Sequence, residues 1–225
     1  MIKAIILASG KGSRFGEKKQ FFKLNGKPLF EYSIEVIDNI ENIDCIYLVL
    51  PPEDLGIKLP KTKKEVIKVA GGTERQFSVY NALQKIKNAE IITIHDSARP
   101  FATKDYFVEG INNIKSGYDG SITAYKSRDT LKVVRENIVR KTLNREEIYI
   151  IQTPQTFDFD KLLYAHKKAI EDNILATDDS YLMERLGFKI TINQGSPLNI
   201  KITTKEDITL ANCILTIKSL MIYQN

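Results

Sequence analysis

The sequence predicts a doubly wound α/β fold, in which a mostly parallel sheet lies between two layers of helices. Short runs rich in β-branched residues alternate along the chain with amphipathic runs of helix length. Residues 2–8 and 45–50 are apolar apart from Lys3, which is typical of strands buried on both faces of a parallel sheet. Polar or glycine-rich segments follow several of these runs, and in such sheets ligands bind beyond the carboxyl ends of the strands.

The predicted strands are short, and most of them stop at residues that disfavour a strand. Pro51 and Pro52 end the strand at residues 45–50, and a pair of glycines ends a strand at residues 66–70. A loop rich in lysine and proline, residues 51–65, connects these two strands. The other strands are predicted at residues 91–95, 121–125 and 188–193.

Helices are predicted from amphipathic spacing and from residues that favour helix starts. Pro28 suits the first position of a helix that runs to about residue 37. Thr73 and Gln76 have capping-box spacing at the start of a helix that runs to about residue 87. The remaining helices are predicted at residues 103–115, at about 160–171, in a short segment from about 177, and at 204–221.

Residues 126–150 interrupt this alternation of strands and helices. Here β-branched residues alternate with charged ones on either side of Glu136 and Asn137, which provide a turn. The segment is therefore predicted to be a two-stranded β-hairpin arm. Because an isolated hairpin is at best marginally stable in water, the arm needs a partner surface.

The composition is that of a globular protein. The chain has 225 residues, of which 43% are hydrophobic and 27% are charged, so disordered and low-complexity classes are excluded. We expect one domain over residues 1–225, with the arm at about 126–150 as a subdomain.

Cys45 and Cys213 lack metal-ligand spacing and are expected to be inert buried thiols. No run approaches the ~18 apolar residues of a membrane span, and no leader is recognisable, so we expect a cytoplasmic protein without a membrane partner.

The net charge of +5 is concentrated at the N-terminus. The first thirty residues contain seven Lys or Arg residues and one Glu, a net charge of +6, so the rest of the chain sums to −1. A local anionic ligand explains this distribution better than a generally basic surface does.

A glycine-rich loop, Ser-Gly-Lys-Gly-Ser-Arg-Phe-Gly at residues 9–16, follows the first predicted strand. Its glycines let backbone N–H groups approach phosphate oxygens closely. The dinucleotide fingerprint fails because Phe15 takes the place of its third glycine, and the Walker pattern fails because Glu17 follows Gly16. The remaining interpretation is a phosphate loop whose cations suit a triphosphate, and those cations are Lys11, Arg14, Lys18 and Lys19.

Three further clusters follow predicted strands, and each also has a purely structural interpretation. Residues 71–78 hold a base or sugar, or form an ordinary strand–helix junction. Asp96 either holds the Mg²⁺ of a nucleotide or caps the next turn. Lys201, on a short β-like run, is either an inward-pointing catalytic cation or an edge-strand lysine. His95 is expected to be a hydrogen-bonded core residue, and His166 a surface residue.

Nine short motifs follow one another along the chain. They are Leu-Ala-Ser-Gly-Lys-Gly-Ser-Arg (7–14), Lys-Gln-Phe (19–21), Gly-Gly-Thr-Glu-Arg-Gln (71–76), His-Asp-Ser-Ala-Arg-Pro (95–100), Arg-Asp-Thr-Leu-Lys (128–132), Asn-Arg (144–145), Gln-Thr-Pro-Gln-Thr-Phe (152–157), Thr-Asp-Asp (177–179) and Asn-Ile-Lys-Ile-Thr (199–203). Singly these motifs are weak. In this order and spacing the chain resembles, over nearly its whole length, the 2-C-methyl-D-erythritol 4-phosphate cytidylyltransferase family of nucleotidyltransferases.

The resemblance implies a Rossmann-like fold with a seven-stranded sheet, and an arm that interlocks with a second copy in a homodimer. It also implies Mg²⁺ and a reaction in which CTP and methylerythritol phosphate give the CDP-linked alcohol and pyrophosphate. Such an enzyme must align two anions that repel each other and stabilise charge on the transferred phosphoryl group. Cations and one metal ion can do this, which agrees with the lack of a Ser/His/Asp or Cys/His set.

The resemblance further implies roles for individual positions. The implied catalytic residues are Arg14, Lys19, Arg145 and Lys201. The implied CTP contacts are Ala8, Ser9, Gly10, Gly12, Arg14, Lys19, Gly72, Thr73, Ser78 and Asp96. The implied contacts to methylerythritol phosphate are Asp96, Arg99, Thr130, Arg145, Thr153, Thr177 and Lys201. Asp96 is the implied metal ligand, and the arm residues Thr130 and Arg145 would reach the active site of the neighbouring subunit.

This chain departs from the family pattern at three positions, and alternatives to the family remain open. Lys18 stands where many relatives have proline, Thr73 where some have an acidic residue, and Tyr149 where tryptophan is common. A ribitol 5-phosphate cytidylyltransferase is the nearest alternative, although Asn-Arg eight residues before Thr153 favours the first family. The failed fingerprint disfavours an NAD-dependent oxidoreductase. The lack of a basic helix or an aromatic stacking platform disfavours a nucleic-acid-binding protein.

Overall fold

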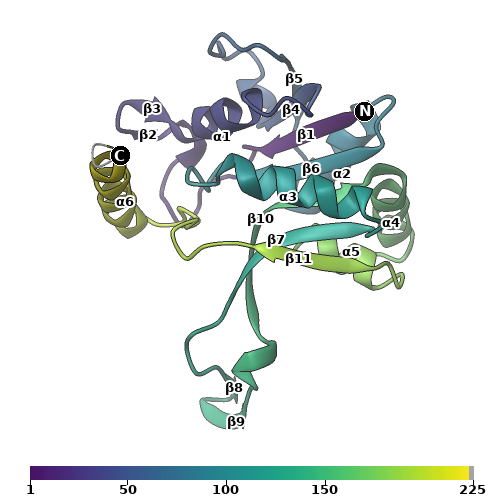
Figure 1. Cartoon of the computed structure of the whole chain (residues 1–225), viewed down its shortest axis with the longest axis vertical. Coiled ribbons are helices and arrows are strands. Elements are labelled where there is room, and N and C mark those ends of the chain that lie inside the picture. Colours follow the sequence, from purple (N-terminus) through teal and green to yellow (C-terminus); the bar gives the residue numbers. More distant parts are fainter. Residues whose placement is uncertain (223–225) are drawn as a thin grey trace.

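The computed structural model describes residues 1–222, with side chains for residues 1–217. It is built on a seven-stranded sheet with the strand order β11-β7-β10-β6-β1-β4-β5 (Figure 1). The strands are β1 (Ile2–Leu7), β4 (Cys45–Leu50), β5 (Glu65–Ala70), β6 (Ile91–Asp96), β7 (Gly120–Lys126), β10 (Tyr149–Asp158) and β11 (Ile190–Gln194). Strand β10 is antiparallel to both of its neighbours, and the other pairs are parallel. The predicted mostly parallel α/β sheet is confirmed.

Helices cover both faces of the sheet. Helices α1 (Leu29–Asp38) and α3 (Lys104–Lys115) pack with Ala4 and Ile6 of β1 in one core. The opposite core contains Ile5 of β1 together with three helices, α2 (Arg75–Lys85), α4 (Phe159–Glu171) and α5 (Asp179–Glu184). Successive side chains of a strand point to opposite faces, so a strand between two helix layers must be apolar throughout.

The C-terminal helix α6 (Glu206–Ile222) lies beside the sheet rather than on it (Figure 1). A third core joins it to Phe15 of the glycine-rich loop, to Leu24 and to Ile202. A small two-stranded sheet, β2 (Lys23–Leu24) and β3 (Lys27–Pro28), precedes α1. The glycine-rich loop and the segment around residue 201 are therefore anchored by the same core. Pro28 lies just before α1, at its N-cap, instead of at the predicted first helical position.

The predicted hairpin arm is present and projects away from the sheet (Figure 1). Its strands are β8 (Lys132–Arg135) and β9 (Ile138–Thr142), which pair in antiparallel fashion. Glu136 and Asn137 form the two-residue turn, both with positive φ, as a tight hairpin turn of this kind requires. Three single-turn 3₁₀ helices complete the described elements, at Lys19–Phe21, Pro52–Asp54 and Arg145–Glu147.

Two local predictions about secondary structure were wrong. Strand β10 was not predicted, because its buried residues include a proline and several polar side chains, among them Gln152 and Thr153. Helix α2 begins at Arg75, two residues later than predicted, and the capping box at Thr73 does not form. The chain is still extended at Glu74, with φ −123° and ψ 165°, and no side chain caps the helix.

Two predictions about burial were also wrong. His166 is completely buried on the inner face of α4, where it contacts Asp179. Cys213 is exposed, whereas Cys45 is buried as expected. Within the described residues, no helix combines the length and apolar character that crossing a membrane requires.

Candidate active site

The sheet brings three predicted motifs to one edge. Leu7, at the end of β1, pairs with Val49 on one side and with Asp96 on the other. Leu50 pairs with Ala70, the last residue of β5. The glycine-rich loop, the glycine pair after β5 and the segment after β6 therefore start from adjacent points.

A cavity of about 370 Å³ lies between the glycine-rich loop and the start of α2. Ser9 Oγ and Ser78 Oγ are 3.0 Å apart, and the backbone N–H of Gly72 donates to Ser78 Oγ over 3.0 Å. A Cβ on Gly72 would lie 2.5 Å from the Cβ of Phe77, so only glycine lets this strand approach the helix so closely. Eight of the ten predicted CTP contacts line this cavity, namely Ala8, Ser9, Gly10, Lys19, Gly72, Thr73, Ser78 and Asp96.

The other two predicted CTP contacts, Gly12 and Arg14, lie in the glycine-rich loop outside the cavity wall. Gly12 has φ +67°, and a Cβ there would lie 1.8 Å from the carbonyl oxygen of Glu17, so this turn requires glycine. Arg14 is exposed, although its charge is near enough to lower the pKa of Lys19. Lys18 points elsewhere, to Asp54 at 2.6 Å and Glu53 at 2.8 Å, and so fixes the loop to the segment after β4.

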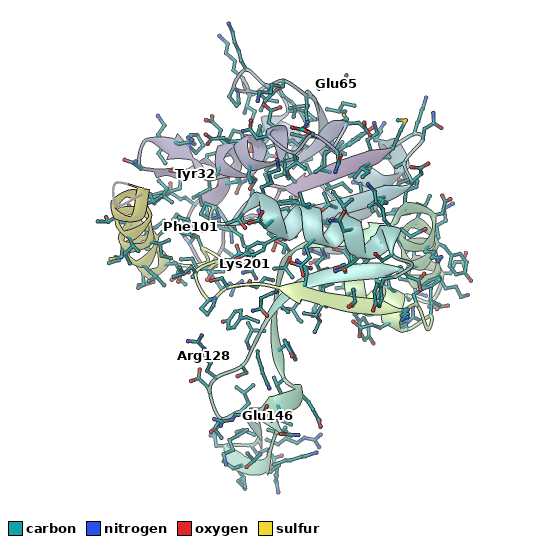
Figure 2. All side chains as sticks on the ribbon, in the orientation of Figure 1. Tyr32, Glu65, Phe101, Arg128, Glu146 and Lys201 are labelled. Carbon is teal, nitrogen blue, oxygen red and sulfur yellow. The ribbon has the colours of Figure 1, made fainter. Side chains whose placement is uncertain are left out.

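A second cavity, of about 680 Å³, lies between β10, α5 and the base of the arm. Its lining includes the predicted substrate contacts Arg99, Thr153 and Thr177. Arg75, Asp96 and Lys201 line both cavities and therefore form the wall between them. Figure 2 shows Lys201 on the segment that connects β11 with α6, above the arm. Two ligands, one in each cavity, would meet at this wall.

Asp96 is the centre of the shared wall. Its Oδ2 accepts a hydrogen bond from Lys201 Nζ over 2.5 Å, and its Oδ1 accepts one from Arg75 Nε over 3.3 Å. Burial alone would raise the pKa of this carboxyl group, but Arg75 and Lys201 outweigh it and hold the pKa well below its usual range. Asp96 is therefore ionised at neutral pH.

Lys19 and Lys201 converge on this wall from opposite ends of the chain. Lys19 Nζ donates to the carbonyl oxygen of Ile202 over 3.0 Å. Burial, and then repulsion by Lys201, lowers the pKa of Lys19. A phosphate group between the two ammonium groups would relieve that repulsion. The site thus has the electrostatic character of an anion-binding site.

His95 positions Asp96 through Thr153. The hydroxyl of Thr153 accepts from the backbone N–H of Asp96 over 3.0 Å, and so its own proton is directed to His95 Nδ1 at 3.1 Å. His95 Nε2 then donates to the carbonyl oxygen of Arg99 at 3.2 Å. Burial lowers the pKa of His95 to about 4, which keeps the imidazole neutral, as this set of bonds requires. The prediction of a hydrogen-bonded core histidine is confirmed.

Lys201 is not on a strand, contrary to prediction, because side chains from β10 and the β6 end take up the polar groups of its segment. Gln152 Nε2 donates to the carbonyl oxygen of Asn199 over 3.0 Å, and Arg99 Nη1 donates to the same oxygen over 2.8 Å. The amide of Asn199 in turn donates to the carbonyl oxygen of Thr153 over 3.0 Å. These bonds place Lys201 opposite Asp96 without a sheet ladder.

The structure does not bring Thr130 and Arg145 to either cavity. Both residues are exposed on the arm, and Arg145 lies 3.8 Å from Glu146 of the same segment. Arg75, which lines both cavities and bonds Asp96, was not predicted as a site residue from the sequence. Its position at the start of α2, three residues after the glycine pair, was the available signal, but an ordinary strand–helix junction was the favoured interpretation of that motif.

Asp96 is the acidic residue that lines both cavities. Over the described part of the chain, no three His, Cys, Asp or Glu side chains are grouped to hold a metal ion. A Mg²⁺ ion needs only one or two carboxylates when phosphate oxygens and water complete its shell. Asp96, ionised and next to the nucleotide-sized cavity, fits that arrangement.

Two cavities that meet at a cationic wall, on a mostly parallel α/β sheet with a glycine-rich loop, define a nucleotidyltransferase-type site. Comparison with known proteins specifies the class further. The model of the 2-C-methyl-D-erythritol 4-phosphate cytidylyltransferase family matches residues 2–217, and the chain belongs to this family. The family prediction made from the nine motifs is confirmed.

Relatives match over almost their full length. A protein of Aquifex aeolicus with the family name is 46% identical over 216 residues, which cover 96% of this chain and 98% of the relative. Another, of Clostridium novyi, is 40% identical over 221 residues, covering 94% and 95%. The crystal structure of 4-diphosphocytidyl-2C-methyl-D-erythritol synthase from Anaerococcus prevotii has a TM-score of 0.86 at 34% identity, covering 96% and 98%.

Proposed function

We propose that this chain transfers the cytidylyl group of CTP to 2-C-methyl-D-erythritol 4-phosphate, a step of the non-mevalonate isoprenoid pathway. The products are 4-diphosphocytidyl-2-C-methyl-D-erythritol and pyrophosphate. Membership of the family supports this reaction. The geometric observation that supports it most is that two cavities share a wall formed by Arg75, Asp96 and Lys201. The smaller cavity binds CTP, and the larger one binds the alcohol phosphate.

The reaction needs alignment and charge stabilisation more than proton transfer. An oxygen of the monoester phosphate attacks the α-phosphorus of CTP, forming a P–O bond, while the bond to the departing pyrophosphate breaks. The nucleophile is already an anion, so no general base is required. Lys19, Lys201 and Arg14 hold the two anions together and stabilise the charge that develops at the α-phosphorus and on the leaving group.

Mg²⁺ is the cation that fits this proposal, and Asp96 would hold it together with phosphate oxygens. The ion would neutralise charge on the triphosphate. Removal of divalent cations with EDTA is expected to abolish pyrophosphate release, and excess Mg²⁺ to restore it. Full activity in EDTA would contradict the metal requirement. An Asp96→Asn variant is expected to need a higher Mg²⁺ concentration for half-maximal activity.

The chain acts, in the same proposal, as a homodimer through the arm. Three large apolar side chains on the arm, Val134, Ile138 and Val139, are 52–58% exposed. Thr130 and Arg145 lie away from the cavities of their own subunit, and in a dimer they would reach the larger cavity of the second copy. We further propose residues 1–225 as one nucleotidyltransferase domain with an arm subdomain at about 126–150, although residues 223–225 lie outside the described part.

Apart from a second copy of the chain, the proposed partners are small molecules, and the proposed location is the cytoplasm. Two of the N-terminal cations, Lys11 and Lys19, line the smaller cavity, and Lys18 is paired with acidic residues. The local positive charge therefore serves a triphosphate, and neither a nucleic acid nor a membrane surface is needed to explain it.

Pyrophosphate release from CTP, measured with two acceptors, tests the substrate assignment. We expect rapid release with methylerythritol phosphate and release slower by at least about 100-fold with ribitol 5-phosphate, because a pocket built to bond one set of hydroxyls rejects another. If only ribitol 5-phosphate reacted, the alternative cytidylyltransferase would replace the proposal. Release with neither acceptor would exclude both.

A further inference from the structure

A buried histidine–aspartate pair lies behind the wall between the two cavities. His166 on α4 and Asp179 at the start of α5 have 0% and 1% of their side-chain surface exposed, and neither lines a cavity. Their atoms are 3.1 Å apart, between His166 Nε2 and Asp179 Oδ1. Burying a charge is costly unless it is paired, so this pair calls for an explanation. The reaction described above does not use it.

The pair is connected to the active site through Arg75. Asp179 Oδ2 accepts a hydrogen bond from Arg75 Nη1 over 2.7 Å, and Arg75 Nε donates to Asp96 Oδ1 over 3.3 Å. A continuous line of bonds therefore runs from α4 through α5 and α2 to the end of β6. Next to it, Gln76 clamps the start of α2, since its side chain bonds the backbone of Ile174 and Ala176.

The bonding pattern fixes the direction of the hydrogen bond between His166 and Asp179. A carboxylate can only accept, so His166 must donate through Nε2. The other ring nitrogen, Nδ1, is buried and has no partner among the described residues, and a proton there would be an unsatisfied donor. His166 therefore acts on Asp179 as a hydrogen-bond donor through Nε2. Its ring stacks on Tyr80, with centroids 6.3 Å apart and 12° between the planes.

Asp179 is held in its charged form. Burial would raise the pKa of its carboxyl group, but Arg75 and His166 outweigh burial and lower it. With Asp179 charged, Arg75 lies between two carboxylates and cannot turn fully toward Asp96. Its side chain remains 27% exposed, and it lines both cavities.

We propose that His166 and Asp179 are positioning residues that hold the Arg75 guanidinium in the wall between the cavities, ready to contact phosphate groups of both substrates. This inference rests on the proposed function of the site. A free arginine loses rotamer freedom when it binds an anion, and an arginine fixed in advance avoids that loss. Without Asp179, Arg75 would pair with Asp96 alone and compete with Lys201 for the same carboxylate.

A double-mutant cycle tests the inference. His166→Phe keeps an aromatic ring against Tyr80 but removes the Nε2–H donor, whereas Tyr80→Leu removes the stacked ring and keeps the donor. Arg75→Lys removes the guanidinium on which the pair acts. The kcat and KM for CTP and for methylerythritol phosphate are measured for each variant and for the pair His166→Phe with Arg75→Lys, together with the unfolding midpoint.

We expect kcat to fall about 10-fold in His166→Phe, since a misplacement of ~1 Å can cost up to ~100-fold. His166→Gln, which carries an amide donor near the Nε2 position, should regain most of the rate, and Tyr80→Leu should stay within about 2-fold of the parent. In the Arg75→Lys background, His166→Phe should cost less than about 2-fold, because its effect passes through Arg75.

Losses that multiply in the double variant, or a His166→Phe enzyme with the parental kcat, would overturn the inference. If His166→Phe does not fold, Asp179→Asn, which preserves volume, takes its place in the cycle with the same expectations. Should the parent protein show no turnover, the proposed function fails. In that case the dissociation constant for CTP is measured for the same four proteins of the cycle, and it tests the positioning role independently of turnover.

Discussion

Lys19 and Lys201 are the two residues on which the proposed chemistry depends most. They stand on one wall although 182 positions separate them, and Lys201 touches Asp96 while Lys19 bonds the carbonyl oxygen of Ile202. Their charges repel each other, and burial together with this repulsion lowers the pKa of Lys19. A bound phosphate would attract both ammonium groups and so offset their mutual repulsion. The site therefore favours its anionic substrates electrostatically.

Replacing either lysine by alanine should reduce kcat by about 100- to 1,000-fold, the usual cost of losing one donor to a developing charge. The fold should remain intact, because each ammonium group lies at the cavity surface. Lys23→Ala is the matched control, since Lys23 is an exposed lysine of the same basic segment outside both cavities. A rate within about 2-fold of the parent in Lys19→Ala or Lys201→Ala would contradict the role given to that residue.

His95 makes the stability of the protein depend on pH. Its pKa is lowered to about 4 in the folded protein, so between that pH and the ordinary value near 6.5 the unfolded chain binds a proton that the folded chain does not. This contribution to stability is complete above about pH 6.5 and is lost as the pH falls toward 4. From the two pKa values, the loss in unfolding free energy amounts to about 3 kcal/mol.

Urea unfolding of the parent and of His95→Gln, at pH 7 and pH 4.5, measures the contribution of His95 to the unfolding free energy. Both proteins lose stability in acid through their carboxylates, and the parent should lose about 2–3 kcal/mol more than the variant. Equal losses in the two proteins would mean that His95 is not held neutral by burial.

The junction of β5 and α2 shows how an element shapes the nucleotide cavity. Gly72 lets the strand pass Phe77 and brings its own N–H to Ser78, and Arg75 then begins the helix at the shared wall. Gly72→Ala places a Cβ 2.5 Å from the Cβ of Phe77 and should lower the unfolding free energy by about 1–3 kcal/mol, with a raised KM for CTP.

Gly56→Ala provides the control for that substitution. Nothing lies within 4 Å of a Cβ at Gly56, so the variant should resemble the parent in stability and in KM. If Gly72→Ala matched the control in both measurements, the close approach of β5 and α2 would not be what forms the cavity.

Elements differ in how far the sequence predicts them. Strands such as β1 and β4 are recognisable because they are almost entirely apolar, and the arm because of its alternation and its turn. Strand β10 was missed because it combines a central Pro154 with buried polar side chains. Gly72, Asp96 and Lys201 could be predicted as site residues because they lie at strand ends or in recognisable motifs. The Arg75–Asp179 bond could not be predicted, because it joins residues 104 positions apart and depends on how α2 and α5 pack.

The arm relates this chain to a second copy in the proposed homodimer. Its exposed apolar residues are unfavourable in water, and its polar residues Thr130 and Arg145 have no cavity of their own subunit to serve. Sedimentation should therefore give about twice the 25.6 kDa mass of one chain. A monomer at micromolar concentration would exclude the shared site.

Subunit mixing tests whether the site is shared. Arg145→Ala and Arg14→Ala should each be nearly inactive, and a mixture of the two should recover up to about a quarter of the parental rate, because random exchange gives half heterodimers with one intact site each. Arg140→Ala provides the control, because it removes a cation of the arm that has no proposed role. It is mixed with Arg14→Ala in the same way. If the mixture with Arg145→Ala recovered no activity, Arg14 and Arg145 of different subunits would not form one active site, and the shared site would be contradicted.

The central claim is that two substrates occupy two cavities that meet at Arg75, Asp96 and Lys201. A crystal structure with methylerythritol phosphate and a CTP analogue, whose α,β-bridging oxygen is replaced by methylene, tests it most directly. We expect cytidine beside Gly72 and Ser78, the alcohol phosphate in the larger cavity, and its phosphate facing the α-phosphorus at the shared wall. A nucleotide in the larger cavity, or an alcohol phosphate bound away from Lys201, would contradict it.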